Sequence, residues 1–133
     1  DVYKRQGQDI FYKSVESTSY LKYLWSKYKL NKSYKSTKDL LEKYDLDAFI
    51  GLTRGPAWKI NYDGGDYIAM SDSPQFGSGG YAAHNGMPHI TIPYFEINKF
   101  PVGISIIGDR WTDKMIIEYA SAIEKSRYNL DTQ

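Results

Sequence analysis

The chain has 133 residues, the usual size of one domain, and its 41% hydrophobic and 25% charged residues are typical of a globular protein rather than a disordered one. Its 17 Lys and Arg balance 16 Asp and Glu, so the overall charge favours neither nucleic acid nor an anionic membrane as the main partner. The absence of Cys excludes disulfides, thiolate zinc sites and Cys nucleophiles, and two His are too few for a His-rich metal site.

Two helices are predicted near the N-terminus. Residues 9–30 are expected to form an amphipathic helix, because apolar side chains recur at the i, i+3, i+4, i+7 spacing that places them on one face. This stripe comprises Leu21, Leu24, Trp25 and Tyr28. A shorter helix is expected around residues 34–44, with Ser36 and Asp39 forming a weak capping signal near its start.

Charge is unevenly distributed along the chain. Residues 1–44 contain 10 Lys or Arg and 5 Asp or Glu, whereas residues 45–133 contain 7 and 11. Because acidic residues are interleaved with the lysines and no Arg cluster occurs, we interpret the basic segment as the solvated face of a helix. No apolar run approaches the roughly 20 residues needed to span a bilayer. We expect a cytoplasmic protein that binds neither nucleic acid nor a membrane.

A buried strand and a long loop follow. Residues 48–52 are almost continuously apolar, which is typical of a strand buried on both faces of an α/β sheet. Residues 53–80 are rich in Gly, Pro, Ser and Asp and are predicted to be loop, and loops of this length are usually functional or covered by other parts of a protein. Residues 81–85 are predicted to be a short helix that ends at Gly86.

Two strands and a helix complete the predicted α/β fold, in which helices pack on a few strands. Segments 89–92 and 102–107 are expected to form an antiparallel hairpin with a rather long connection through Asn98. Thr112 is predicted to cap the last helix, with Asp113 suited to its positive start. The apolar stripe of this helix comprises Met115, Ile116, Tyr119, Ala120 and Ile123.

Ser78, a serine among glycines, is the most conspicuous candidate for chemistry. Ser nucleophiles occur in Gly-x-Ser-x-Gly turns, but residues 77–79 have the wrong spacing and no apolar strand leads directly into them. His84 and His89 are candidate bases, although His in such positions more often packs or forms hydrogen bonds. His84 follows Ser78 by six residues, which places it on roughly the opposite side of a helix. We therefore expect Ser78 to cap a helix or border a pocket.

The loop before Ser78 contains the remaining candidates. Asp63, Asp66 and Asp72 flank a pair of glycines, but the alternating ligands and closing Glu of a calcium loop are absent, so no metal site is predicted. Trp58 could line a pocket or anchor the loop. These residues alone do not establish an activity.

Four stretches follow one another in an order and at intervals that are specific. They are residues 46–53 (Leu-Asp-Ala-Phe-Ile-Gly-Leu-Thr), residues 55–58 (Gly-Pro-Ala-Trp), residues 77–93 with Gly-Met-Pro-His-Ile-Thr-Ile-Pro at their end, and residues 100–105 (Phe-Pro-Val-Gly-Ile-Ser) with Gly108 and Trp111. Together they resemble the C-terminal part of the amidase signature family. The resemblance is to peptide-amidase-like and aminohexanoate-cyclic-dimer-hydrolase-like members.

The resemblance implies the mixed α/β sheet of that family and hydrolysis of carboxamide or peptide-like amide bonds. In the family, a Ser nucleophile is activated through a second, cis-peptide Ser and a Lys, and a Gly/Ser-rich stretch donates amides to the oxyanion. No position in this chain matches those catalytic residues, because the family places them N-terminal to the stretches matched here. Residues 77–80 imitate the Gly/Ser signature but stand in the C-terminal small-residue segment.

We therefore predict a single partial domain over residues 1–133. It comprises a helical lead-in (1–46), an amidase C-terminal region (47–127) and a tail (128–133). The expected partners are the missing N-terminal amidase portion and, in the complete enzyme, a small amide substrate, and self-association of the chain is a further expectation. Two alternatives stay open, a non-catalytic binding module with a Tyr/Trp surface and an inactive split-gene fragment.

The loop from Arg54 to Ser78 is the best candidate for lining a substrate entrance. Trp58, Asp66 and Ser78 are the candidate substrate contacts. No catalytic residue, cofactor or metal is expected in this chain. We expect the parent enzyme to be an amidase and the 133 residues alone to be inactive.

Overall fold

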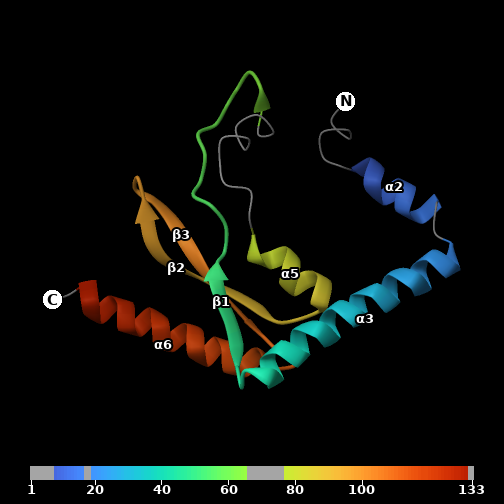
Figure 1. Ribbon diagram of the computed structural model, residues 1–133. Coiled ribbons are helices and arrows are strands. Elements are labelled where there is room, and N and C mark those ends of the chain that lie inside the picture. The colour runs from blue at the N-terminus through green and yellow to red at the C-terminus, as the bar shows by residue number, and fades with distance from the viewer. Residues whose placement is uncertain (1–7, 17–18, 66–76, 132–133) are drawn as a thin grey trace.

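The computed structural model describes residues 8–16, 19–65 and 77–131 (Figure 1). Its elements in chain order are α2 (Gln8–Glu16), α3 (Tyr20–Lys43), β1 (Ala48–Leu52), α5 (Ser78–Asn85), β2 (His89–Ile97), β3 (Phe100–Gly108) and α6 (Asp113–Asp131). The strands form one sheet with helices packed against both faces, which confirms the predicted α/β class. Within these ranges, no helix has the length and apolar character that crossing a membrane requires.

The sheet is antiparallel, with strand order β1-β3-β2. β2 and β3 form the predicted hairpin, but the expectation of a long connection is wrong, because both strands extend to a turn of two residues. Asn98 and Lys99 occupy this turn with φ angles of 53° and 68°. Positive φ at both positions gives a turn whose twist matches that of the strands, so the hairpin closes tightly.

Alternation along β3 separates the two faces of the sheet. Toward α6, the buried apolar cluster comprises Ile92, Ile104, Ile106, Ile116 and Ala120. Toward α3 and α5, a second cluster comprises Leu41, Ala82, Met87 and Ile107. The apolar stripe predicted for the last helix therefore faces the sheet, through its buried Ile116 and Ala120.

β1 is a strand, as predicted, but the expectation that both of its faces are buried is wrong. Ile50 and Leu52 are 63% and 42% exposed. β1 lies at an edge of the described sheet with β3 as its neighbour, so its outer side is not covered by another strand there. An open apolar groove of about 380 Å³ runs between β1 and α6. A continuous apolar run identifies the strand but does not say what covers it.

The helix boundaries predicted near the N-terminus are wrong. α2 ends at Glu16, and α3 runs without interruption from Tyr20 to Lys43. Ser36 therefore lies inside α3 instead of at the start of a helix. Residues 30–36 contain neither Pro nor Gly, the residues that stop helices most effectively, so nothing breaks α3 there.

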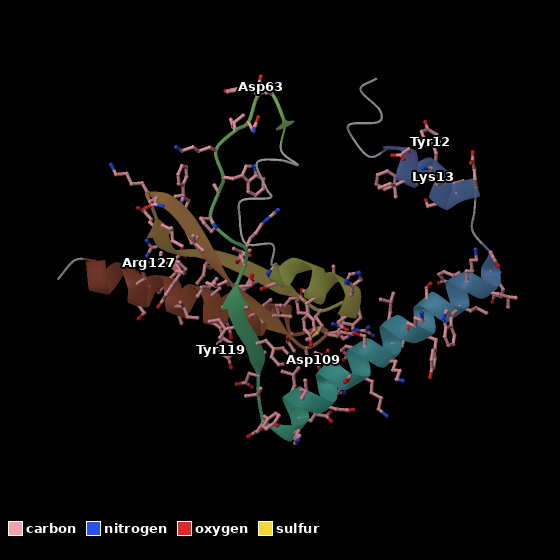
Figure 2. The ribbon with its side chains drawn as sticks, turned by 45° about the horizontal axis from the view of Figure 1, so that its top comes forward. Tyr12, Lys13, Asp63, Asp109, Tyr119 and Arg127 are labelled. Atoms are coloured by element: carbon pink, nitrogen blue, oxygen red, sulfur yellow. The ribbon has the colours of Figure 1, made fainter. Side chains whose placement is uncertain are left out.

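Polar contacts join α3 to the turn between β3 and α6, where Asp109 lies (Figure 2). Tyr34 Oη donates to Asp109 Oδ1 at 2.7 Å, and the Arg110 guanidinium lies 3.6 Å from the centre of the Tyr34 ring. Arg110 Nε and Nη2 donate to the Asn85 carbonyl oxygen at 3.0 and 2.8 Å, and this pair of hydrogen bonds connects the same turn to the end of α5. Thr112 stands before α6 as predicted, but its hydroxyl donates to the Asp109 carbonyl oxygen at 2.7 Å and closes the turn.

Replacing Ile116 by Ala should lower the free energy of unfolding by about 2–5 kcal/mol, because it leaves a cavity between α6 and the sheet. The matched control is Ile117→Ala, one residue along the same helix, where the side chain is mostly exposed. The control should change the free energy of unfolding by less than about 1 kcal/mol. Urea denaturation of both variants measures the difference, and equal effects would contradict the described packing.

The hydrogen bond to Asp109 raises the pKa of the Tyr34 hydroxyl above its usual value of about 10, and partial burial acts in the same direction. The neutral hydroxyl is favoured in the folded state, so this bond stabilises the fold below about pH 10 and is lost as the pH rises through the raised pKa. A pH titration of isotope-labelled tyrosines by NMR should show Tyr34 ionising late, and Asp109→Asn should lower its pKa. Ionisation of Tyr34 at the usual pH would contradict this.

Candidate functional site

Four polar side chains gather on the face of the sheet that carries α5. They are Thr53, His89, Thr91 and Ser105, and we call them the polar network. Ser105 Oγ lies at the centre, 2.7 Å from His89 Nε2 and 2.8 Å from Thr53 Oγ1. Thr53 Oγ1 reaches Thr91 Oγ1 at 3.3 Å, and Thr91 Oγ1 lies 3.5 Å from both His89 Nε2 and Ser105 Oγ. Ser105 is completely buried, whereas Thr91 is exposed.

Strand register explains why these four side chains meet. Ser105 of β3 lies opposite Thr91 of β2 and Gly51 of β1. Thr53, just beyond β1, donates its N–H to the Gly103 carbonyl oxygen at 2.9 Å. A Cβ on Gly103 would lie 2.7 Å from Thr91 Cγ2 and 3.1 Å from Thr53 Oγ1, so only glycine leaves room for both threonines.

Hydrogen-bond geometry gives a direction to two contacts of the polar network. Ser105 Oγ donates to Thr53 Oγ1, and Thr53 Oγ1 donates to Thr91 Oγ1. In the contact between Ser105 Oγ and His89 Nε2, the tautomer of the imidazole sets which atom donates.

Ser105 and His89 do not form an accessible nucleophile and its general base, despite their short separation. A nucleophile must reach a carbonyl carbon, and the complete burial of Ser105 prevents this. The Ser105 hydroxyl is also directed at Thr53 Oγ1. Instead, the polar network joins residues of β2 and β3 to Thr53 at the end of β1 through mutually satisfied hydrogen bonds.

Ser78 is tied to the end of β1. Its hydroxyl donates to the Leu52 carbonyl oxygen at 2.6 Å, and its N–H donates to the Thr53 carbonyl oxygen at 3.1 Å. The preceding residue, Gly77, forms an antiparallel bridge with Arg54. The Ser78 hydroxyl is thus engaged as a donor to the backbone, while His84 is exposed on the same helix.

The loop after β1 is described as far as Gly65. The Arg54 guanidinium lies 4.9 Å from the centre of the ring of Trp58, which is half-buried. Asn61 Oδ1 accepts hydrogen bonds from the backbone N–H groups of Asp63 and Gly64 at 3.1 and 2.7 Å. Such a turn needs no metal ion to hold its shape. Asp63 points away from the sheet at the outer end of this loop (Figure 2).

The structure describes two of the three candidate substrate contacts. Trp58 stands in the loop after β1 and Ser78 at the start of α5, on the two segments that the bridge between Arg54 and Gly77 joins. Asp66 lies outside the described residues, as does Asp72. In the part of the chain that is described, no group of three His, Asp or Glu side chains could hold a metal ion.

Sequence reasoning singled out His89 but none of the hydroxyls with which it interacts. Thr53, Thr91 and Ser105 all lie in stretches that resemble the family, but a single Thr or Ser on a strand has no motif of its own. The alternation of side chains along a strand could have placed Thr91 beside His89, because residues 89 and 91 share one face of β2. Strand register, which sequence did not determine, was needed to place Ser105 beside them.

Comparison with known proteins gives partial matches. No protein-family model matches the chain. Over 45 residues the chain is 44% identical to the A subunit of the glutamyl-tRNA(Gln) amidotransferase of Thermotoga maritima, covering 33% of this chain and 10% of that protein. The crystal structure of PAM12A is similar with a TM-score of 0.57 and 34% identity, covering 66% of this chain and 16% of that one. The chain thus spans a small part of both proteins.

The matched amidotransferase protein is an amidase-signature enzyme, so this match supports a relation to the amidase-signature superfamily. It does not distinguish between members of that superfamily. The expectation drawn from the four sequence stretches is therefore supported at the level of the superfamily. The narrower resemblance to peptide-amidase-like members stays a prediction.

An activated phosphonate should label neither Ser78 nor Ser105, because the Ser78 hydroxyl donates to the Leu52 carbonyl oxygen and Ser105 is completely buried. Mass spectrometry of peptides from the treated chain measures the labelling, with a serine protease in a parallel reaction to show that the reagent is active. Stoichiometric labelling of Ser78 that His84→Ala abolishes would reveal a local Ser–His pair. Labelling of Ser105 that His89→Ala abolishes would show that Ser105 is accessible and that His89 activates it.

Proposed function

We propose that this chain is the C-terminal part of an amidase-signature hydrolase that cleaves carboxamide or peptide-like amide bonds. In such an enzyme a Ser hydroxyl attacks the amide carbonyl, its proton passes through a second Ser to a Lys, and the amine leaves with a proton. Water then hydrolyses the acyl-enzyme to the acid. The proposal locates this Ser, second Ser and Lys in a portion of the protein N-terminal to the matched stretches.

The observation that supports this proposal most directly is the 44% identity over 45 residues with an amidase-signature amidotransferase protein. Hydrolases and amidotransferases both open an amide through acyl transfer, so this match is compatible with either activity. The four sequence stretches favour the hydrolase, because they resemble peptide-amidase-like members.

In this proposal the chain contributes a wall of the substrate site, and the reacting groups come from elsewhere. The polar network uses its hydroxyl protons internally, so it acts as a rigid support under the start of α5. Trp58 and Ser78, which flank the bridge between Arg54 and Gly77, are the proposed substrate contacts together with Asp66. An aromatic ring held by a guanidinium suits the apolar part of an amide substrate.

The proposal also accounts for the uncovered side of β1. Ile50 is largely and Leu52 partly exposed, and the groove between β1 and α6 is mostly apolar. Exposed apolar surface next to an edge strand is a site for association. We propose that the remaining portion of the amidase covers it, and that self-association covers it when this chain is alone.

A second candidate function is a non-catalytic binding module. Trp111 and Tyr62 are 94% and 90% exposed, and Trp111 has a φ of 70°, a conformation that bulky residues rarely adopt. Exposed aromatic side chains are suited to contact a glycan or a protein partner. This candidate requires no further catalytic portion.

The 133-residue chain alone should hydrolyse no amide, because the proposed Ser, second Ser and Lys lie in another portion, Ser105 is completely buried and the Ser78 hydroxyl donates to the Leu52 carbonyl oxygen. Purified protein incubated with simple carboxamides and amino-acid anilides measures this. Turnover that survives repurification would contradict the assignment of the catalytic residues to another portion.

The intact mass of the natural protein separates the two candidate functions. The amidase proposal expects a protein several times heavier than the 15.3 kDa of this chain, with a Lys and paired Ser upstream. A natural protein of 15.3 kDa without turnover would exclude the amidase proposal and favour the binding module.

A further inference from the structure

The N-terminal half of α3 carries an apolar stripe with no cover in the described structure. Leu21, Leu24, Trp25 and Tyr28 expose between 42% and 75% of their surface. In Figure 1 this half of the helix extends away from the sheet, and the buried residues of α3, Thr37 and Leu41, lie in its other half. A helix needs to bury its apolar stripe against something, so this stripe indicates a surface of contact.

The stripe faces away from the body of the molecule. Successive residues of a helix are about 100° apart, so Tyr28 lies about 180° around the axis from the buried Thr37. Leu21 and Trp25 lie about 160° from Leu41 by the same spacing. The stripe is therefore not an extension of the face by which α3 packs on α5. Its partner must approach from the opposite side.

Basic residues accompany the stripe without acidic ones. Between residues 20 and 37 the chain contains five Lys and no Asp or Glu. These are Lys22, Lys27, Lys29, Lys32 and Lys35, whereas the next lysine, Lys38, pairs with Glu42 at 3.6 Å. The Lys29 ammonium lies 5.4 Å from the centre of the Trp25 ring, and Lys27 lies 6.0 Å from that of Tyr23. The partner of this surface must therefore combine negative charge with an apolar phase.

We propose that this surface, defined by the four residues of the stripe and the five lysines from Lys22 to Lys35, docks α3 lengthwise on an anionic lipid bilayer. Leu and Trp would enter the boundary between headgroups and acyl chains, Tyr would lie at the headgroups, and the Lys ammoniums would reach anionic phosphates. Four to eight cations on an amphipathic helix are sufficient for such attraction. This proposal is independent of the amidase proposal.

Two features favour lipid over other anionic partners. The stripe would bury leucine side chains, and the phosphate backbone of a nucleic acid offers no apolar environment in which to bury them. All cations between residues 20 and 43 are Lys, and none is Arg, the residue that best recognises phosphate and carboxylate through paired hydrogen bonds. A surface whose cations are all Lys is suited to attraction by the diffuse negative charge of anionic lipid headgroups. The proposal replaces two expectations drawn from the sequence, that the protein binds no membrane and that this basic segment is only a solvated helix face, because the balanced charge of the whole chain conceals this local concentration.

Co-sedimentation of the full 133-residue chain with vesicles tests the proposal. We expect at least tenfold stronger partitioning onto vesicles of phosphatidylcholine mixed with phosphatidylglycerol than onto phosphatidylcholine alone, and a decrease with added salt. In a Trp58→Phe, Trp111→Phe background, the fluorescence of Trp25 should shift to shorter wavelength on binding. Equal partitioning onto both vesicles, or none, would overturn the proposal.

Matched charge reversals assign the contact to α3. Lys27→Glu with Lys29→Glu should weaken vesicle binding at least tenfold, whereas Lys114→Glu with Lys125→Glu, which makes the same charge change on α6, should leave it within twofold. Leu24→Ser with Trp25→Ser should also weaken it, because the apolar stripe is lost. Circular dichroism checks that each variant is folded. An equal loss of vesicle binding in both charge variants would contradict the assignment to α3. Binding of the chain to soluble polyglutamate without binding to vesicles would show that the partner is an anionic polypeptide.

Discussion

β3 is the strand on which the rest of the structure depends, because it is the central strand and its two faces differ chemically. Ile104 and Ile106 point toward α6 and hold that helix through apolar packing. Ser105, between them in sequence, points to the other face and centres the polar network. A slip of one residue in register would exchange these faces and place isoleucine where three hydroxyls and an imidazole meet. Apolar burial and hydrogen bonding thus specify the same register independently.

The elements with regular periodicity were predictable from sequence. The strand at residues 48–52, the hairpin, and the last helix with its Ile116 face all follow from spacing and β-branched content. The boundary between the first helices was not predictable from sequence. The segment around Ser36 favours a cap only weakly, and the continuous helix is stabilised by tertiary contacts of Thr37 and Leu41. Sequence also could not show that β1 lies at an edge, since a strand's neighbours are not encoded in its own pattern.

The candidate site was predictable only in part, for a related reason. His89, Trp58 and Ser78 could be singled out as chemical types, but the meaning of each depends on partners distant in sequence. His89 is next to Ser105 only after β2 and β3 pair, and the same pairing brings Thr91 within reach of both side chains. The chemistry proposed for the complete enzyme rests on similarity to the amidase-signature superfamily and not on the described residues.

The attachment of Ser78 to the end of β1 limits what can extend the sheet at that edge. Because Thr53 donates to Gly103 of β3, alternation directs the backbone groups of Ala48, Ile50 and Leu52 outward. The Ser78 hydroxyl already occupies the carbonyl oxygen of Leu52, so an added strand could pair fully only with the first part of β1. An edge this short is a poor template for runaway strand addition, which protects against fibre growth while leaving room for one specific neighbour.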